Sequence, residues 1–163
     1  MKATVMSLLG FLALASVSLV FAQSPVVRVL PEQLKWEPDP EGLGFSTAIV
    51  EGDPKKAGLY IIMVKFPPYV MSRPHFHGES HYATVVKGTW YTGEGDTFDP
   101  NKTVPLKPGS FMKHPMGTRH FDGSKAEEVI VQLMGTGPST TTKVDPSKGL
   151  FQAQVVEKPA IRS

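Results

Sequence analysis

Residues 74–82 are Pro74-His75-Phe76-His77-Gly78-Glu79-Ser80-His81-Tyr82 and contain three of the chain's five histidines. Alternate side chains of a β-strand share one face, so a strand here would present the His75 and His77 imidazoles to one point. His81 would lie farther away, because four extended residues at about 3.3 Å each span about 13 Å. A common ion therefore requires the chain to bend, and Gly78-Glu79-Ser80 favours a bend.

A further histidine follows a second turn. Pro115-Met116-Gly117 can bring a separate strand, beginning near His120, back to the same cavity. Imidazole nitrogens suit zinc, copper, iron, nickel and, less selectively, manganese. We therefore expect one divalent transition metal from this group. The expected ligands are four histidines: His75, His77, His81 and His120.

The remainder of the chain predicts short strands. Gly and Pro number 15 each and apolar residues make up 40% of the 163 residues, which favours one all-β domain with many tight turns. Outside the first 22 residues no apolar stripe of helical period persists for three turns. The longest interruption, residues 93–102, has room for a helical turn. Segments rich in Val, Ile, Tyr and Phe predict strands over residues 26–30, 45–50, 59–66, 81–87, 110–114 and 128–134.

The first 22 residues resemble a secretory signal peptide. Lys2 gives a positive start, residues 5–21 are largely apolar, and Val20 and Ala22 fit the small-residue cleavage pattern. The alternative is a membrane anchor, since a span needs at least about 17 residues. No positive cluster follows the segment, so we favour cleavage, a mature single domain over residues 23–163, and no stable membrane span afterwards. Secretion or a periplasmic location follows.

Charge and cysteine content exclude several function classes. The formal net charge is +2, and loss of Lys2 with the leader leaves +1, because 2 minus 1 is 1. A nearly neutral chain has no electrostatic footprint for nucleic acid. The chain has no cysteine, which excludes disulfides, thiolate ligands and a cysteine nucleophile.

Both histidine stretches resemble the sequence motifs of the cupin family. The first cupin motif is Gly, five residues, His-x-His, three or four residues, Glu, six residues, Gly. Here His75-x-His77, three residues, His81, six residues and Gly88 match it from the histidines onward. The second motif is Gly, five residues, Pro-x-Gly, two residues, His, three residues, Asn. The stretch from Gly109 through Pro115-x-Gly117 to His120 matches that one.

Three positions depart from the cupin motifs. Tyr69 stands where the first motif opens with Gly, and Ser124 stands where the second closes with Asn. More important for the metal, His81 occupies the usual position of a glutamate ligand, which resembles the four-histidine subclass of cupins. Glu79 lies two residues earlier and is the alternative ligand to His81.

The resemblance implies a cupin fold, a double-stranded β-helix or jelly-roll barrel, and a small-molecule substrate or ligand. The first activity that it implies is an oxygenase-like, metal-dependent oxidoreductase. Four protein ligands would leave two coordination positions of the ion open. The alternatives are a metal-dependent isomerase, lyase or hydrolase, and a non-catalytic cupin that senses metal or ligand. Cupins often dimerise by exchange of a strand, so we also expect a homodimer with residues 26–30 as donor.

Other side chains are candidates for roles around the ion. Gln132 could accept a hydrogen bond from a histidine ring, or its side chain could face solvent. Arg73 could bind an anionic substrate, or it could be a solvated surface group. Phe111, with Trp90 and Tyr91, could wall the pocket, or instead form core or an oligomer contact. The turn at 115–117 separates His114 from His120, so we expect His114 outside the metal shell.

Overall fold

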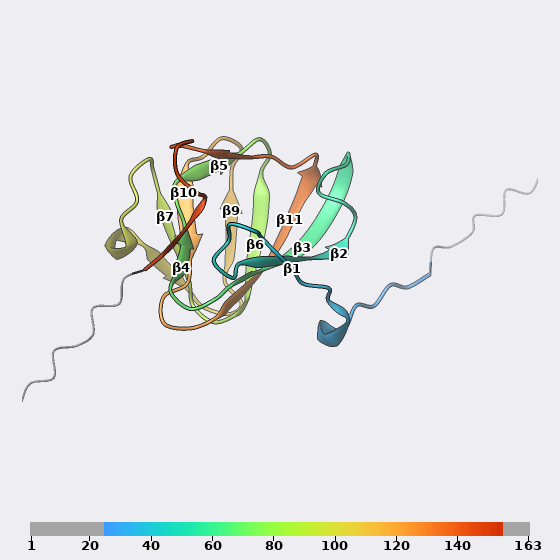
Figure 1. Ribbon diagram of the computed structural model, residues 1–163. Helices are drawn as coiled ribbons and strands as arrows, with labels where there is room; N and C mark the ends of the chain where they lie inside the picture. Colours follow the sequence, from blue (N-terminus) through green and yellow to red (C-terminus); the bar gives the residue numbers. More distant parts are fainter. Residues whose placement is uncertain (1–24, 155–163) are drawn as a thin grey trace, which may run out of the picture.

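Two antiparallel sheets face each other and close into a barrel (Figure 1). The computed structural model describes residues 25–154, so the predicted signal peptide over residues 1–22 lies outside the described residues. Within residues 25–154 the structure is all-β apart from two short 3-10 turns, η1 (Pro31–Gln33) and η2 (Pro100–Lys102). No helix in this part of the chain is long and apolar enough to cross a membrane.

The first sheet contains the longest strands. β3 and β11 pair over nine residues each, with Phe66 opposite Val129 and Gly58 opposite Gly137. In order across the sheet, the strands are β1 (Glu37–Pro38), β2 (Ser46–Glu51), β3 (Gly58–Phe66), β11 (Val129–Gly137), β6 (His81–Lys87) and β9 (Phe111–His114).

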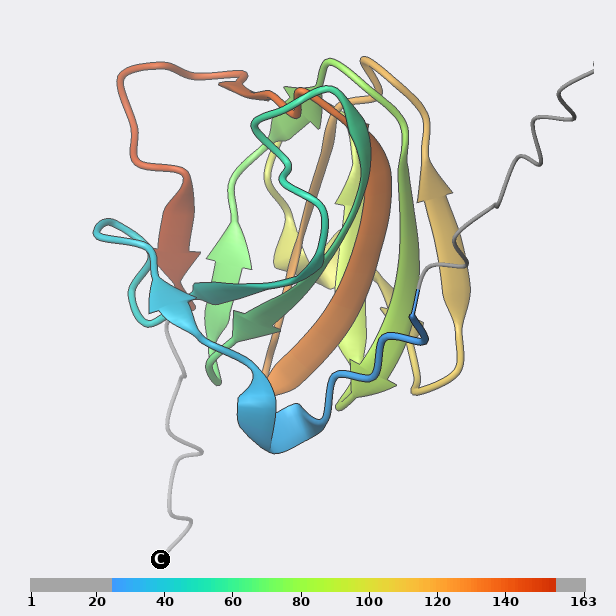
Figure 2. The same cartoon turned by 90° about the vertical axis from the view of Figure 1, so that its right-hand side faces the viewer.

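The second sheet is built from shorter strands. Figure 2 shows β13, drawn in red, beside β4 at the edge of this sheet. The main order is β12 (Thr141–Lys143), β5 (His75–His77), β10 (His120–Gly123), β4 (Val70–Ser72) and β13 (Phe151–Ala153), and β10 also pairs with β7 (Trp90–Glu94), which pairs with β8 (Val104–Leu106).

The core lies between the two sheets and follows from alternation along their strands. In β11, Val129 and Val131 are fully buried, and in β3 Val64 and Phe66 are nearly so. Burial of an aliphatic or aromatic side chain of this size stabilises the fold by about 1.5–3 kcal/mol. Part of this apolar layer, including Val64 and Phe66, lines the same cavity as the histidines.

Five of the six predicted strands are confirmed, with bounds shifted by at most a few residues, and the helical turn expected in residues 93–102 is η2. The strand expected over residues 26–30 is wrong for the single chain. Val26 and Val27 are 74% and 67% exposed, and these residues pair with no strand in the described part of the chain. Their β-branched side chains favour extended backbone, but no sheet edge receives them.

Candidate metal centre

All five histidines of the chain line one cavity of about 230 Å³ between the sheets. His75 and His77 come from β5 and His120 from β10, whereas His81 and His114 come from β6 and β9 of the other sheet. Neighbouring rings follow one another around the cavity. The centroid distances are 4.0 Å for His81 and His77, 5.0 Å for His77 and His75, 4.3 Å for His75 and His120, and 3.6 Å for His120 and His114.

The bend expected after β5 is present. Residues 78–80 leave the second sheet, and His81 begins β6 in the first sheet. Glycine fits this bend without displacing a neighbour, because a Cβ at position 78 would lie 2.5 Å from Thr140 Oγ1. The turn at residues 115–117 packs on the same bend, since the Gly117 amide donates to the His77 carbonyl at 2.9 Å. The two turns therefore fix each other and bring β10 to the histidines of β5.

Backbone carbonyls favour one common tautomer in three of the rings, and at His77 the Thr141 hydroxyl also lies 3.2 Å from Nδ1. Each Nδ1 lies within hydrogen-bond distance of a carbonyl oxygen, which only a protonated nitrogen can use, so Nε2 keeps its lone pair. This is the usual arrangement of a histidine that binds metal. The distances from Nδ1 are 2.8 Å for His75 to Arg73, 3.1 Å for His77 to Thr140 and 2.8 Å for His120 to Thr118.

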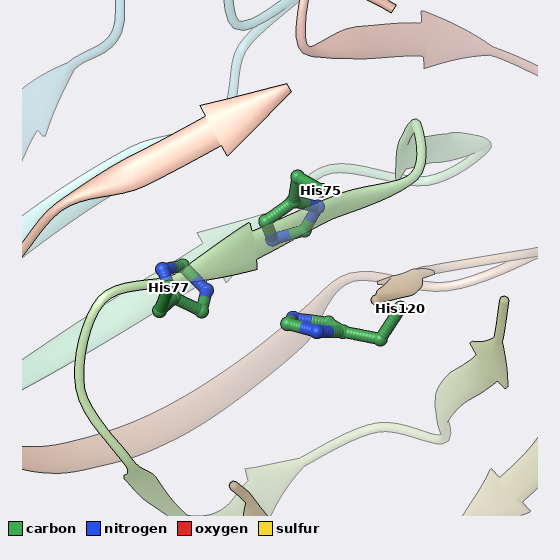
Figure 3. A group of neighbouring side chains, drawn as sticks. All are labelled: His75, His77 and His120. Carbon is green, nitrogen blue, oxygen red and sulfur yellow. The ribbon is translucent and has the colours of Figure 1, made fainter. Parts of the chain in front are cut away.

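The same three side chains converge on one point. Figure 3 shows the rings of His75 and His77, from β5, and of His120, from β10, around a shared space. One ligand nitrogen from each lies within 4.8 Å of the others. Nε2 of His120 is buried and has no hydrogen-bond partner, a costly state for a polar atom unless an ion or water binds it. These residues fit a divalent transition metal.

His81 lines the same cavity as these three histidines but is held by side chains instead of backbone carbonyls. Its Nε2 lies 2.8 Å from Glu79 Oε1 and 2.8 Å from the Tyr60 hydroxyl. Glu79 Oε2 also accepts from the Thr140 amide at 3.2 Å. His77, Glu79 and His81 form a second cluster whose ligand atoms lie within 4.8 Å of one another. The structure thus places both the expected fourth ligand and its alternative beside His77.

His114 corrects an expectation, because it lies among the other histidines. It pairs with His81 across β6 and β9, and its ring stacks on that of His120 at 3.6 Å with an interplanar angle of 20°. The side chain is buried. The only sequence signal for its inward orientation was that His114 and Met112 lie two residues apart and so share one strand face. The closeness of the His114 and His120 rings depends on how the two sheets pack.

Asp122 is the carboxylate that the sequence reasoning missed. It is buried, and its Oδ2 lies 3.7 Å from Nε2 of His120. The spacing His120-x-Asp122 on β10 repeats the alternation of His75-x-His77 on β5, and this signal could have identified it. Burial raises the pKa of Asp122, although His120 opposes the rise.

Burial also keeps four of the histidines neutral, namely His75, His77, His81 and His114. Desolvation, together with the neighbouring imidazoles, lowers the pKa of His75 and of His77 to about 3 and that of His114 to about 2. The pKa of His81 is lowered by burial too, against the pull of Glu79. Neutral imidazole is the form that binds metal, so these rings are ready to act as ligands without losing a proton near neutral pH.

Three tentative site residues are placed elsewhere. Arg73 Nη1 donates to the carbonyls of Gly149 at 2.8 Å and Phe151 at 2.6 Å, so it fixes β13 and does not face the cavity. Gln132 alternates with the inward Val131 and therefore lies on the other face of β11. Backbone carbonyls, and not Gln132, accept the hydrogen bonds from three of the histidine rings. Phe111 is 65% exposed.

Of the other expected wall residues, Trp90 lines the cavity and Tyr91 does not. Tyr91 alternates with Trp90 along β7, and the ammonium of Lys125 lies 4.3 Å from its ring centroid. The apolar wall opposite the histidines is formed instead by aromatic side chains near β13. Phe45 stacks on Phe151 at 4.4 Å, and both line the cavity.

Comparison with solved structures identifies the fold. RemF, a polyketide cyclase from Streptomyces resistomycificus, has a TM-score of 0.61 at 17% identity, covering 74% of this chain and 86% of that one. An RmlC-like cupin from Ralstonia eutropha has a TM-score of 0.58 at 19% identity, covering 78% of each chain. KdgF from Halomonas sp. has a TM-score of 0.52 at 20% identity, covering 66% of this chain and 91% of that one.

No protein-family model matches the chain, and no curated protein matches it. The structural likeness, at identities of 20% or less, concerns the fold alone. A cupin-like protein from Thermotoga maritima shows the same likeness, with a TM-score of 0.51 at 18% identity, covering 63% of this chain and 80% of that one. Residues 25–154 thus have the cupin fold, a double-stranded β-helix of two antiparallel sheets with a cluster of histidines that could bind a metal ion.

Proposed function

We propose that this protein is a metal-dependent enzyme that acts on a small organic molecule inside the barrel. The proposed ligands of one divalent transition metal are His75, His77, His81 and His120. The observation that carries the proposal is the common tautomer of His75, His77 and His120, whose Nε2 atoms are left free beside one cavity. Manganese, iron, zinc, copper and nickel all accept such a nitrogen-rich site.

Each side of the cavity has a separate task in this proposal. The bound ion supplies a Lewis-acid and, for iron, manganese, copper or nickel, a redox-active centre. Four neutral imidazoles leave its charge of +2 uncompensated, so the histidine side attracts an anionic or polar oxygen group. Phe45 and Phe151 provide the apolar wall against which the carbon skeleton packs. A cavity of about 230 Å³ limits the substrate to a small molecule.

The reaction class proposed first is an oxygenase-like oxidoreduction. It is supported by the apolar wall next to the histidine cluster, because dioxygen and an apolar substrate both partition into such surroundings. Its expected substrates are small diketones, phenols or thiols. Consumption of dioxygen with product formation by the metal-loaded protein would support this class.

A second class, a lyase, isomerase or hydrolase that needs no dioxygen, is favoured by a specific group of side chains. The Tyr60 hydroxyl and the Glu79 carboxylate are joined by hydrogen bonds to His81, which lines the cavity, and the three groups can hold or pass a proton. Burial raises the pKa of Tyr60. Two similar structures are of enzymes with non-oxidative names: RemF, a polyketide cyclase, and DMSP lyases at a TM-score of 0.52.

One experiment distinguishes the two classes. The protein is purified, its metal identified by elemental analysis, and the same substrate panel assayed in air and under anaerobic conditions. Turnover in air only supports the oxygenase, and equal turnover in both supports the second class. If the metal-loaded protein binds a ligand tightly but forms no product, it acts as a sensing or binding cupin and both enzymatic proposals fail.

Export and dimerisation are further proposals, each with its own test. Residues 1–22 are proposed to direct secretion or periplasmic export, and mass spectrometry of the exported protein should show Gln23 as its first residue. The exposed apolar side chains of Val26 and Val27 support residues 26–30 as the strand exchanged in a homodimer. Light scattering at micromolar concentration should give twice the monomer mass, and a monomer mass would reject the dimer.

A further inference from the structure

We propose that His114, His120 and Asp122 form a second set of metal ligands, so that one ion can occupy either of two adjacent positions in the cavity. The proposal rests on the proposed metal site, with which it shares His120, and extends it to two side chains outside the cupin motif positions. One ligand atom from each of the three lies within 4.8 Å of the others. The set spans both sheets, with β9 contributing one residue and β10 two.

The three side chains of this set are buried, and one of their ligand atoms has no partner. Nε2 of His120 is buried without a hydrogen-bond partner, and the residue is only 1% exposed. The side chain of His114 is only 7% exposed, and its ring stacks on that of His120. Asp122, at 6% exposure, directs Oδ2 to within 3.7 Å of His120 Nε2. Three buried ligand atoms that face one another are better satisfied by a bound cation than by an interior without one.

Charge supports the same conclusion. A carboxylate inside an apolar barrel is costly unless a cation or several hydrogen bonds compensate it. No lysine or arginine within residues 25–154 forms an ion pair with Asp122, whose Oδ2 lies 3.7 Å from Nε2 of His120. A divalent ion bound by Asp122 and two neutral imidazoles would remove that cost and retain a net charge of +1. Zinc, manganese and iron accept such a mixture of nitrogen and oxygen ligands.

The two sets exclude each other. Nδ1 of His120 donates to the Thr118 carbonyl at 2.8 Å, so only Nε2 is free, and its single lone pair binds one ion at a time. The chain should therefore bind one tight equivalent of metal and not two. If the ion moved toward Asp122, the net charge of the ion with its ligands would fall from +2 to +1. The number of open coordination positions would also change, and the backbone would not have to move.

Cobalt(II) titration of the metal-free full chain tests the second set directly. In the variant His75→Gln with His77→Gln, we expect one equivalent still to bind, weakened about a hundredfold because two of four ligands of the first set are gone. Adding Asp122→Asn should weaken binding at least a further tenfold and alter the visible cobalt bands. If the folded double variant binds no cobalt, or if Asp122→Asn changes nothing in it, the second set does not exist.

A reporter at His114 avoids dependence on the folding of a multiple variant. His114→Cys should give a thiolate-to-cobalt charge-transfer band, and the matched control Phe111→Cys, on an exposed position of the same strand, should give none. Absence of the band at position 114, or two tight equivalents in the wild-type chain, would overturn the proposal. Failure of the first set is distinguishable, because His75→Gln with His77→Gln would then leave the wild-type affinity unchanged.

Discussion

The two sheets hold their histidines in different ways. On the second sheet, His75, His77 and His120 are each fixed by a hydrogen bond from Nδ1 to a backbone carbonyl. On the first sheet, His81 is held by the side chains of Tyr60 and Glu79, and His114 by stacking on His120 and an edge contact with Trp90. Backbone carbonyls move little, whereas side chains can change partners. The second sheet thus offers a preorganised half-site, and the first sheet an adaptable one.

The largest effect is expected from removal of the preorganised ligands. His75→Ala with His120→Ala removes two of four proposed ligands. Four-ligand zinc sites bind with about 10–16 kcal/mol, so half of that corresponds to a loss of more than about a thousandfold in affinity. Competition with a chelator of known affinity measures it, with circular dichroism to confirm the fold. Unchanged metal content would contradict the proposed site.

A smaller loss of metal affinity is expected when only the hydrogen bond from a histidine Nδ1 to its backbone carbonyl is disturbed. In Gly78→Ala the new Cβ would lie 2.5 Å from Thr140 Oγ1 and must displace the side chain or the backbone of Thr140, whose carbonyl accepts from His77 Nδ1. Loss of such a hydrogen bond typically lowers metal affinity about 10–100-fold. Chelator competition is again the measurement.

Thr140→Ala provides the matched control for that substitution. It removes the clashing Oγ1 but leaves the Thr140 carbonyl that accepts from His77. The double variant Gly78→Ala with Thr140→Ala should therefore recover most of the affinity. If Gly78→Ala alone binds metal as tightly as the wild type, the carbonyl does not determine how His77 is oriented.

Replacement of an adaptable ligand should matter less still. His81→Glu should retain the metal with an affinity change below about tenfold, because carboxylate and imidazole both serve as ligands to these ions. The carboxylate would cancel one unit of the ion's charge, so azide should bind the metal-loaded variant more weakly than the wild type. Azide titration followed by absorption measures this. Loss of the metal would show that His81 is not replaceable, and that the first sheet is as constrained as the second.

Much of the preorganised half could be predicted from sequence, because its signals are local. Alternation along a strand placed His75 and His77 on one face, and the glycine at position 78 indicated the bend. The carbonyl that fixes His77 could not be predicted, since it belongs to Thr140, 63 residues away. Strands as short as β12 and β13, three residues each, carry too few alternations to be recognised.

The adaptable half was predicted less completely, because its geometry depends on long-range packing. His81 was expected at the site on the resemblance to cupins, and the structure brings it beside His77. His114 was placed outside the shell because its position depends on the register of β6 with β9 and on the contact between sheets. For Arg73, Gln132 and Phe111 the sequence left two alternatives open, because local parity does not reveal distant carbonyls or which strand face is buried.

The last expected effect concerns the stability of the metal-free protein in acid and not its metal affinity. His75 and His77 have folded-state pKa values of about 3 and His114 of about 2, against an ordinary value of 6.5. Between pH 6.5 and about 3 the unfolded chain binds protons that the folded chain excludes. The free energy of unfolding should therefore fall as the pH falls through this window, and not change above it from these groups.

Thermal unfolding of the metal-free chain at pH 7 and pH 4.5 measures that loss, with the Tm falling by roughly 4 °C for each kcal/mol. His114→Gln removes one of the three groups and should flatten the dependence. A matched control, Asp96→Asn, alters an exposed ion pair with Arg119 and should leave the slope unchanged. If His114→Gln and wild type lose the same number of degrees, His114 is already solvated in the folded chain, and the adaptable half of the site is open to water rather than packed against His120.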